Sequence, residues 1–271
     1  MQVTKIKPQT GWLSINWKEM SQFRELLFIL IWRDILTRYK QTVLGIAWAV
    51  LQPVFLMLIF TMIFGRLAKI GSEGFPYAVY VYAGLLPWTF FSNAVTQSGQ
   101  SLVINKHLFT KTYFPRLFIP MSSVGVGLVD LSISCVVYAC ILFYYNIMPS
   151  YHIIYLPILI GLTVIAALGF GFTLSALTVT YRDIRFVVPF MIQIMMYLSP
   201  VVYPVTMIPE KYQLYLAVNP MTGIIHAYRS AILGTPFNPE MFAVSVSATF
   251  ILFIFGLFYF RKTERRFADI A

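Results

Sequence analysis

Composition places the chain among membrane proteins. Of its 271 residues, 59% are hydrophobic and only 11% are charged, whereas soluble domains carry about 25% charged residues. An ordinary soluble domain is excluded. Nucleic-acid binding is a poor explanation of the net charge of +10, because no soluble domain remains to present a basic face. The two cysteines, Cys135 and Cys140, have neither a metal-ligand nor a redox spacing, and we expect buried, inert thiols.

The N-terminal stretch WLSINWKEMSQFRELLFILIW, residues 12–32, has an amphipathic pattern. Trp17, Met20, Phe23 and Leu27 follow one another at intervals of three to four residues, with charged and amide side chains between them. This pattern favours a helix that lies in the membrane interface with its apolar face down, and a disordered leader is the alternative. Because no continuous apolar core precedes residue 25, no cleavable signal peptide is expected.

Runs without charged residues predict the membrane spans, because a spanning helix needs about 20 apolar residues. The third run is long enough for two helices, with a break at Asn146 to His152, so six spans are expected in a single transmembrane domain. Residues 1–40 form its N-terminal part, 41–260 the bundle and 261–271 a tail. The runs are Gln41 to Gly65, Gly74 to Asn105, Leu117 to Tyr181, Phe186 to Pro209 and Met241 to Phe260.

The distribution of lysine and arginine predicts the orientation, because cytoplasmic flanks retain these cations. With the N-terminus inside, 16 of the 20 cations fall on inner segments. The outer segments hold Arg66, Lys69, Lys211 and Arg229. Both termini are therefore expected in the cytoplasm.

Two connecting segments are unusual. The inner segment NKHLFTKTYFPR, residues 105–116, mixes cations with apolar and aromatic residues, as a short helix docking into a partner would; snorkelling at the lipid surface explains it equally well. Residues 199–236 contain Pro200, Pro204, Pro209 and Pro220, which break any continuous helix. We expect two short re-entrant helices here on the outer side, with a tip near Asn219, or else a loop packed on the headgroups.

The second span carries aromatic residues on one helical face: Tyr77, Tyr80, Trp88 and Phe91. Such rings could pack against sugar rings in a path for carbohydrate, and an aromatic belt with ordinary helix packing is the alternative. Asp130 lies near the middle of the third span, and an intramembrane carboxylate usually has a partner and faces the bundle interior or a cavity. A structural role is at least as well supported for it as a role in transport.

Several kinds of catalytic motif are absent from the sequence. It contains no G-x-x-x-x-G-K-[ST] phosphate loop, no H-E-x-x-H and no nucleophile elbow, and its three histidines are scattered. We therefore expect no bound metal or cofactor and no catalysis by this chain, but a transporter subunit that takes its energy from another protein.

Three stretches together resemble a known family. WRDILTRYKQTVLGIAWAVLQPVFLMLIFTMIFGRLAKI, YVYAGLLPWTFFSNAVTQSGQSLVINKHLFTKTYFPRLFIP and YRDIR, in this order, look like the membrane subunit of polysaccharide-exporting ABC transporters of the type-2 exporter fold, the O-antigen, capsule and teichoic-acid permeases. The resemblance covers almost the whole chain. It implies a homodimer in the inner membrane joined to two copies of a separate ATPase, which binds ATP and Mg. A lipid-linked polysaccharide would pass to the outer leaflet between the two permease halves.

The resemblance also assigns segments to roles. Trp12 to Trp32 resembles the interface helix, Asn105 to Arg116 the coupling helix and Val205 to Leu233 the outer gate helices. The channel lining would comprise the aromatic stripe of the second span with Trp48 and Phe55 of the first, and Asp130 is included in the substrate path. The expected coupling residues are Lys106, His107, Leu108, Phe109 and Lys111, and the expected gate residues are Tyr203, Pro204, Pro209, Asn219 and Pro220.

A basic cluster precedes the first span. Arg33, Arg38 and Lys40 lie where a pyrophosphate-bearing lipid carrier would approach, and guanidinium groups can fork onto phosphate oxygens. Plain topology anchoring explains the same cations. Two other functions stay open: the same fold exporting a smaller lipid or drug, and a membrane-embedded enzyme that modifies glycans.

Overall fold

The computed structural model describes residues 17–40, 45, 47–111, 114–181 and 183–264, with side chains apart from those of 17–19 and 109–111. Every regular element in these ranges is a helix. In chain order they are α1 (Trp17–Gln22), α2 (Arg24–Lys40), α3 (Ala47–Phe60), the π-helix η1 (Thr61–Leu67), α4 (Tyr77–Ile104), α5 (Lys106–Lys111), α6 (Phe118–Tyr144), the 3-10 helix η2 (Tyr151–Tyr155), α7 (Leu156–Thr180), α8 (Ile184–Leu198), the 3-10 helix η3 (Val205–Met207), α9 (Glu210–Leu216), α10 (Pro220–Leu233) and α11 (Pro239–Glu264).

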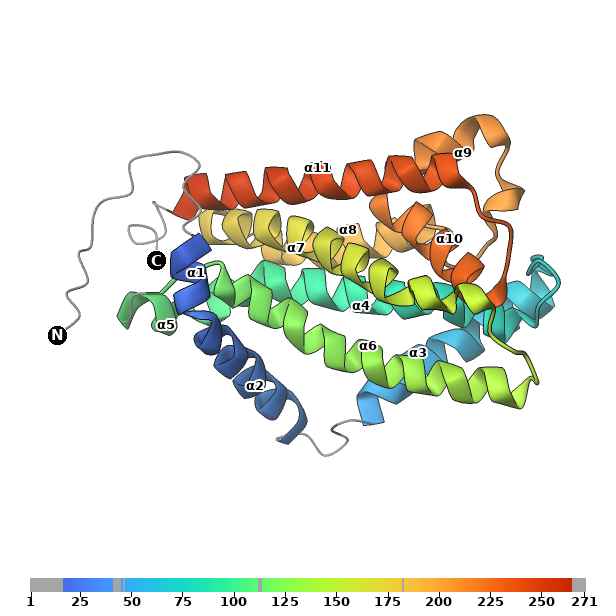
Figure 1. Ribbon diagram of the computed structural model, residues 1–271, viewed down its shortest axis with the longest axis horizontal. Helices are drawn as coiled ribbons and strands as arrows, with labels where there is room; N and C mark the ends of the chain where they lie inside the picture. The colour runs from blue at the N-terminus through green and yellow to red at the C-terminus, as the bar shows by residue number, and fades with distance from the viewer. Residues whose placement is uncertain (1–16, 41–44, 46, 112–113, 182, 265–271) are drawn as a thin grey trace.

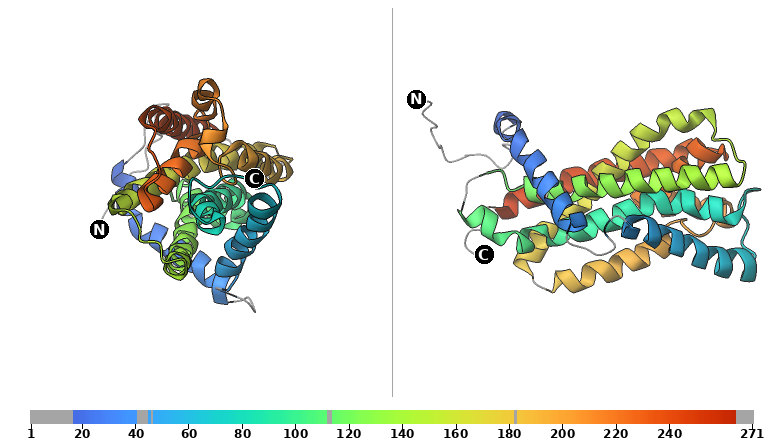
Figure 2. Two further views of the ribbon diagram at one scale, coloured as in Figure 1. Left: turned by 90° about the vertical axis from the view of Figure 1, so that its right-hand side faces the viewer. Right: turned by 90° about the horizontal axis from the view of Figure 1, so that it is seen from below.

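The long helices run roughly along one axis and form a bundle around α4 (Figure 1). Seen along that axis, α4 lies near the centre (Figure 2, left). It packs most extensively against α6 and α7, and also against α10, α3 and α8. Most of its 28 residues are buried, and the main hydrophobic core is built around them.

Glycines let the helices of this bundle approach closely. A Cβ on Gly169 of α7 would lie 2.9 Å from the backbone of Phe253 in α11. A Cβ on Gly127 of α6 would lie 3.0 Å from the Phe90 ring of α4. Small residues at such crossings are typical of helices that associate in membranes, where van der Waals packing replaces the hydrophobic effect.

Helices occupy all five of the predicted runs. Among the described residues, four helical stretches are long and apolar enough to cross a membrane: Ala47–Leu67, Phe118–Tyr144, Tyr151–Thr180 and Pro239–Glu264. The predicted break in the long third run is confirmed, because α6 ends at Tyr144 and Asn146 has a left-handed φ of 55°. The helix α4 is long enough but carries a polar face, described below, and α8 has only 15 residues.

The predicted fourth run, Phe186 to Pro209, is helical only as far as Leu198. Ser199 has a ψ of 145°, and the ring of the following Pro200 disfavours a helical conformation at that position. The remainder of the run belongs to the proline-rich segment. The cysteine prediction also needs correction, because Cys140 is exposed and Cys135 only partly buried.

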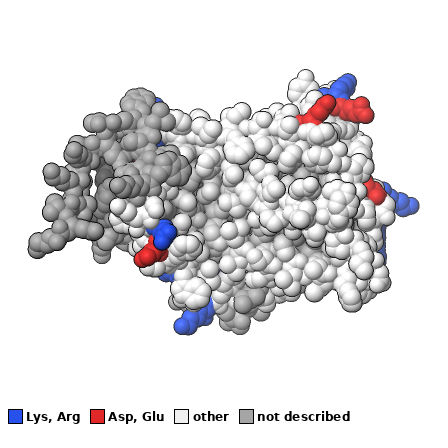
Figure 3. All heavy atoms as spheres, viewed as in Figure 1, with Lys and Arg blue, Asp and Glu red and all other residues white. Residues whose placement is uncertain are grey.

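Charged residues in the described part of the chain lie toward the two ends of the molecule in the view of Figure 3, and the middle of that face carries none. The helices α1 and α5 and the end of α11 lie at one end, and α9 lies at the other (Figure 1). The segments that the cation distribution assigned to one side of the membrane thus gather at one end of the bundle.

The amphipathic N-terminal segment folds as α1 and α2. Residues 12–16 lie outside the described residues, and α2 continues past Trp32 to Lys40. One face of α2 packs on α6, where a Cβ on Gly125 would lie 2.7 Å from Ile31. The opposite face leaves large apolar side chains exposed, among them Phe28 (69%) and Trp32 (63%). An exposed apolar face of this kind suits contact with lipid.

Candidate functional site

A stripe of uncharged polar side chains runs along α4. Its residues are Thr89, Ser92, Asn93, Thr96, Gln97 and Gln100. At about 100° per residue they share one helical face. Every other residue of α4 is buried except Val103 and Ile104 at its end. The exposed face of the central helix is therefore polar over more than three turns.

The stripe has free hydrogen-bonding capacity. The hydroxyls of Thr89, Ser92 and Thr96 donate to backbone carbonyls of their own helix, Thr96 to Ser92 O at 2.7 Å. Among the described residues, the side-chain amides of Asn93, Gln97 and Gln100 have no hydrogen-bond partner. Unpaired amides facing hydrocarbon would be costly. The stripe therefore suits water, a second protein surface or a polar solute.

The four aromatic residues predicted to line a path lie on the opposite face of α4. Their relative exposures are 9% for Tyr77, 1% for Tyr80, 3% for Trp88 and 0% for Phe91. Tyr77 donates a hydrogen bond to Val202 O at 2.5 Å, and the Phe91 ring packs edge-on against Phe170 at 5.5 Å. The burial supports the alternative of helix packing, because a passing sugar would not reach rings enclosed by α4's own neighbours.

The two aromatic residues predicted on the first span are exposed. Trp48 is 56% and Phe55 53% exposed, both on α3. This helix and α8 both contact α4. The view from below shows α3 and α8 along the same edge of the bundle (Figure 2, right).

Asp130 has two partners, both from the end of α2. The Arg38 guanidinium forms an ion pair with it, with 2.5 Å between Nη1 and Oδ2, and the Tyr39 hydroxyl donates a hydrogen bond to Oδ1. Burial and this hydrogen bond raise the pKa of Tyr39, so its hydroxyl stays a donor. The pair is only partly buried, with side-chain exposures of 30% for Arg38 and 16% for Asp130. It fastens α2 to the middle of α6.

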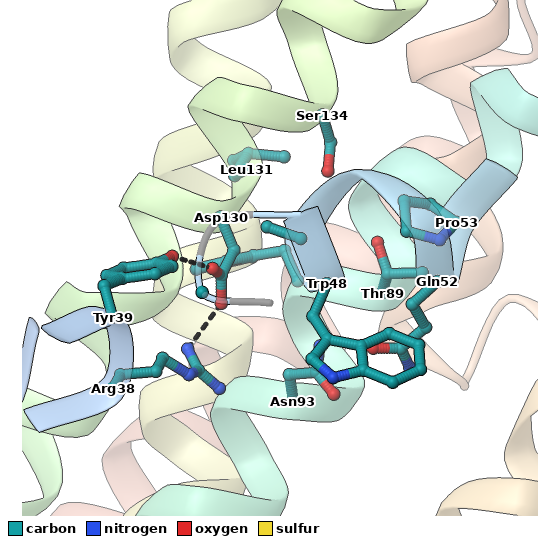
Figure 4. Close-up of a pocket in the computed structure, with 13 residues that line it drawn as sticks. Arg38, Tyr39, Trp48, Gln52, Pro53, Thr89, Asn93, Asp130, Leu131 and Ser134 are labelled. Atoms are coloured by element: carbon teal, nitrogen blue, oxygen red, sulfur yellow. Dashed lines mark hydrogen bonds and ion pairs between the residues drawn. The ribbon is translucent and has the colours of Figure 1, made fainter. Parts of the chain in front are cut away.

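This cluster forms one wall of a cavity of about 190 Å³ between α2, α3, α4 and α6. Figure 4 shows Arg38, Tyr39 and Asp130 on one side, and Trp48, Gln52 and Asn93 on the other. Thr89 and Asn93 belong to both the cavity and the polar stripe. The stripe therefore opens into a cavity that contains an ion pair, amide groups and an indole ring.

The other two cations of the predicted phosphate-binding cluster are placed differently. Arg33 pairs with the neighbouring Asp34 and donates to Asn105 Oδ1 at 2.9 Å, and Ser122 donates to Asp34 Oδ2 at 3.1 Å. These bonds tie α2 to the end of α4 and to α6. Lys40 is exposed at the end of α2. Of the three, Arg38 alone lines the cavity.

The segment expected to couple to a partner contains the short helix α5, which projects at one end of the bundle beside α1 (Figure 1). Lys106 and His107 are exposed and Leu108 is partly buried. The side chains of Phe109 and Lys111 lie outside the described residues.

The proline-rich segment contains the expected pair of short helices, α9 and α10. They meet at Asn219, which caps α10 by accepting from Met221 N at 3.1 Å and donates to Ser199 Oγ at 2.8 Å. Pro220 and Pro204 are buried, Tyr203 is partly buried, and Pro209 is exposed. Four of these five gate candidates therefore pack in the fold around α10 rather than projecting as a free loop.

Arg229 is a key residue that the sequence analysis missed, since it was counted only as one of the outer cations. It lies on α10 and is 1% exposed. Its guanidinium donates to Pro200 O and Val201 O at 2.6 Å each, and to Tyr80 O at 3.3 Å, and it lies 3.9 Å from the centre of the Tyr80 ring. A buried cation held by carbonyls and a ring locks the proline-rich segment onto α4. The only signal in the sequence was a lone arginine within an apolar helix.

The charge of Arg229 also affects Glu73 in the loop before α4. Burial raises the pKa of Glu73 in that loop, and the nearby Arg229 partly offsets the rise. Gly84 of α4 makes room for the guanidinium, since a Cβ there would lie 2.7 Å from Nη2.

A bundle of long apolar helices with charge at its ends and a polar stripe along its central helix defines an integral membrane protein of the permease class. Residues 25–233 match the family of ABC-2 type transporters. The chain belongs to this family.

Several of the proteins that the chain resembles are named as export or transport proteins. Over 91% of its length the chain is 31% identical to the O-antigen export system permease protein RfbA of Klebsiella pneumoniae, of which it covers 95%. It is 27% identical to a protein of the same name from Myxococcus xanthus, with 91% and 96% of the two chains covered. It is 26% identical to the polysialic acid transport protein KpsM of Escherichia coli, with 77% and 80% covered. These similarities indicate a transport permease rather than an enzyme.

Proposed function

We propose that the chain is the permease subunit of an ATP-driven exporter that moves a lipid-linked polysaccharide from the cytoplasmic to the outer leaflet of the inner membrane. The polar stripe of α4 carries this proposal. Hydroxyl and amide groups can exchange hydrogen bonds with sugar hydroxyls, and without charge they hold no single sugar tightly. A chain of sugars could therefore slide along the stripe.

A second copy of the chain would complete the path. The stripe lies on one face of a single chain, so a wall is needed opposite it. The helix α8 leaves large apolar side chains exposed, including Phe186 (68%) and Phe190 (64%), which suit burial against protein or lipid. The homodimer is also what the resemblance to polysaccharide permeases implies, and the relatives' names support the substrate class.

The energy would come from a separate ATPase, two copies of which would bind the dimer from the cytoplasm. The sequence has no phosphate-binding loop of its own, so ATP and Mg would be held by that partner. The exposed helix α5 is the proposed docking element. With α5 at the cytoplasmic end, both termini would be cytoplasmic, as the cation distribution predicts.

Deletion of the gene, followed by staining of surface and internal glycan, tests this function. Lipid-linked polysaccharide trapped inside with none at the surface is the expected result. Normal display with altered glycan composition would point to an enzyme, and unchanged glycan would point to a smaller lipid or drug as the substrate.

A matched pair of variants tests the stripe. Thr96 and Ser247 each donate to the carbonyl four residues earlier, at 2.7 and 2.8 Å, but Ser247 is exposed on α11. Thr96→Leu should slow export while Ser247→Leu leaves it unchanged, at equal membrane levels. Equal export by the two variants would remove the stripe from the path.

A further inference from the structure

The cavity at the end of the polar stripe has the chemistry of a binding site for a sugar phosphate. Its lining combines three kinds of group: the Arg38 guanidinium, the amides of Gln52 and Asn93, and the Trp48 indole ring. An indole presents a flat apolar face to the C–H groups of a sugar, and amides bond its hydroxyls. A guanidinium can fork onto two phosphate oxygens.

The size of the cavity limits the ligand. Its volume of about 190 Å³ is below the roughly 300–1,000 Å³ of pockets that enclose drug-sized molecules. It would therefore enclose one sugar ring with part of its phosphate linkage. More distal sugars would lie along α4, where the stripe continues from Asn93 to Gln100.

The ion pair with Asp130 gives the site two states. In this structure Arg38 is held by the carboxylate, and Tyr39 donates to the other oxygen of the same group. The pair is partly exposed at the cavity wall, so a phosphate can reach the guanidinium. If Arg38 turned to the phosphate, the Asp130 carboxylate would still accept the hydrogen bond from Tyr39 and would not lose both of these partners.

We propose that this cavity binds the first sugar of a lipid-linked glycan together with its phosphate linkage, and that Asp130 competes with the phosphate for Arg38. The proposal rests on the proposed function and names the part of the substrate that the permease recognises. Because Asp130 is a competitor, neutralising it has the opposite effect to removing Arg38.

Binding can be measured by microscale thermophoresis on the full-length permease in nanodiscs, with farnesyl diphosphate carrying one N-acetylglucosamine residue as the probe. Arg38→Ala and Arg38→Lys should each weaken binding, the first by tenfold or more, because lysine keeps the charge but lacks the fork. Asp130→Asn should tighten binding several-fold. A purely structural role of the pair predicts weaker binding for Asp130→Asn, and that result would overturn the competition.

The indole has a matched control. Trp48 and Trp32 are similarly exposed, at 56% and 63%, but Trp32 does not line the cavity. Trp48→Ala should weaken binding of the probe several-fold and Trp32→Ala should not. Binding of farnesyl diphosphate without the sugar should be weaker and insensitive to Trp48→Ala. Equal effects of the two tryptophan variants would overturn the assignment of the sugar to this cavity.

A third probe separates the lipid-linked source of the ligand from a soluble one. UDP-N-acetylglucosamine carries the same sugar and diphosphate without a lipid, and it should bind much more weakly. Binding as tight as that of the lipid-linked probe would overturn the lipid-linked assignment. Export in cells is measured separately. If the protein exports glycan but binds none of the probes, the proposed binding site is refuted while the proposed function stands. The gene deletion tests the function itself.

Discussion

We expect Arg229 to contribute strongly to the stability of the end of the bundle that contains α9 and α10. The substitution Arg229→Met tests this. The substitution keeps an unbranched side chain but removes donors from the carbonyls of Tyr80, Pro200 and Val201. Each buried carbonyl left without its donor costs roughly 1–3 kcal/mol, so three of them should cost about 3 kcal/mol or more. Since a chain of 150–250 residues loses roughly 2–4 °C per kcal/mol, the melting temperature should fall by about 6 °C or more.

Thermal unfolding of purified wild type and variant, in one detergent at one scan rate, is the assay. Lys211→Met is the control, because Lys211 also belongs to the predicted outer cations but is exposed beside the Tyr212 ring. A second, local measurement uses a variant in which the exposed Cys140 and the partly buried Cys135 are replaced by serine. In this background a cysteine in place of the fully buried Val201 should react with maleimide only when Arg229→Met is also present. Melting of Arg229→Met within about 1 °C of Lys211→Met would refute the reasoning.

Three further predictions concern other parts of the bundle. Gly256→Val should lower the yield of folded protein, measured by size-exclusion chromatography. A Cβ at this position would lie 2.9 Å from Thr173 Oγ1 and closer still to the backbone of α7. Normal elution of the variant would contradict the close packing of α7 and α11. Asp34→Ala should make α2 more accessible to protease, since Asp34 connects Arg33 to Ser122, and an unchanged digestion pattern would count against that link. Lys106→Glu with Leu108→Ala should reduce co-purification of the partner ATPase without affecting membrane insertion; normal co-purification would remove α5 from the interface.

The positions of the helices could largely be predicted from the sequence. Which face of each helix packs against its neighbours could not. Charge-free runs found α3, α4, α6, α7, α8 and α11 because hydrocarbon excludes charge, and Asn146 and the prolines marked the breaks. Periodicity also showed that α4 has an aromatic face. It does not say which face is packed, however, because inside a membrane both neighbouring helices and lipid accept aromatic rings. The polar residues between Thr89 and Gln100, which the sequence analysis did not use, would have been the better guide, since amides facing lipid would be costly.

Contacts between distant segments explain what else was missed. Asp130 was expected to have a partner, but Arg38 lies 92 positions away and was assigned to phosphate or to topology anchoring. Arg229 was counted as an outer cation because the rule for orientation counts charges without regard to burial. In both cases the sequence identified the charged residue, and only the packing of the helices could identify its partner.

The two arginines show why one site suits an exchangeable ligand and the other does not. Arg229 is enclosed and held by backbone carbonyls, which cannot move away without unfolding the segment that carries them. Arg38 is 30% exposed and held by a side-chain carboxylate at the wall of a cavity. In the proposed exchange a phosphate in that cavity would replace Asp130 as the partner of Arg38, and the carboxylate would keep the hydrogen bond from Tyr39. The proposed exchange of a ligand therefore suits the partly exposed Arg38, whereas the contacts of the buried Arg229 stabilise the fold.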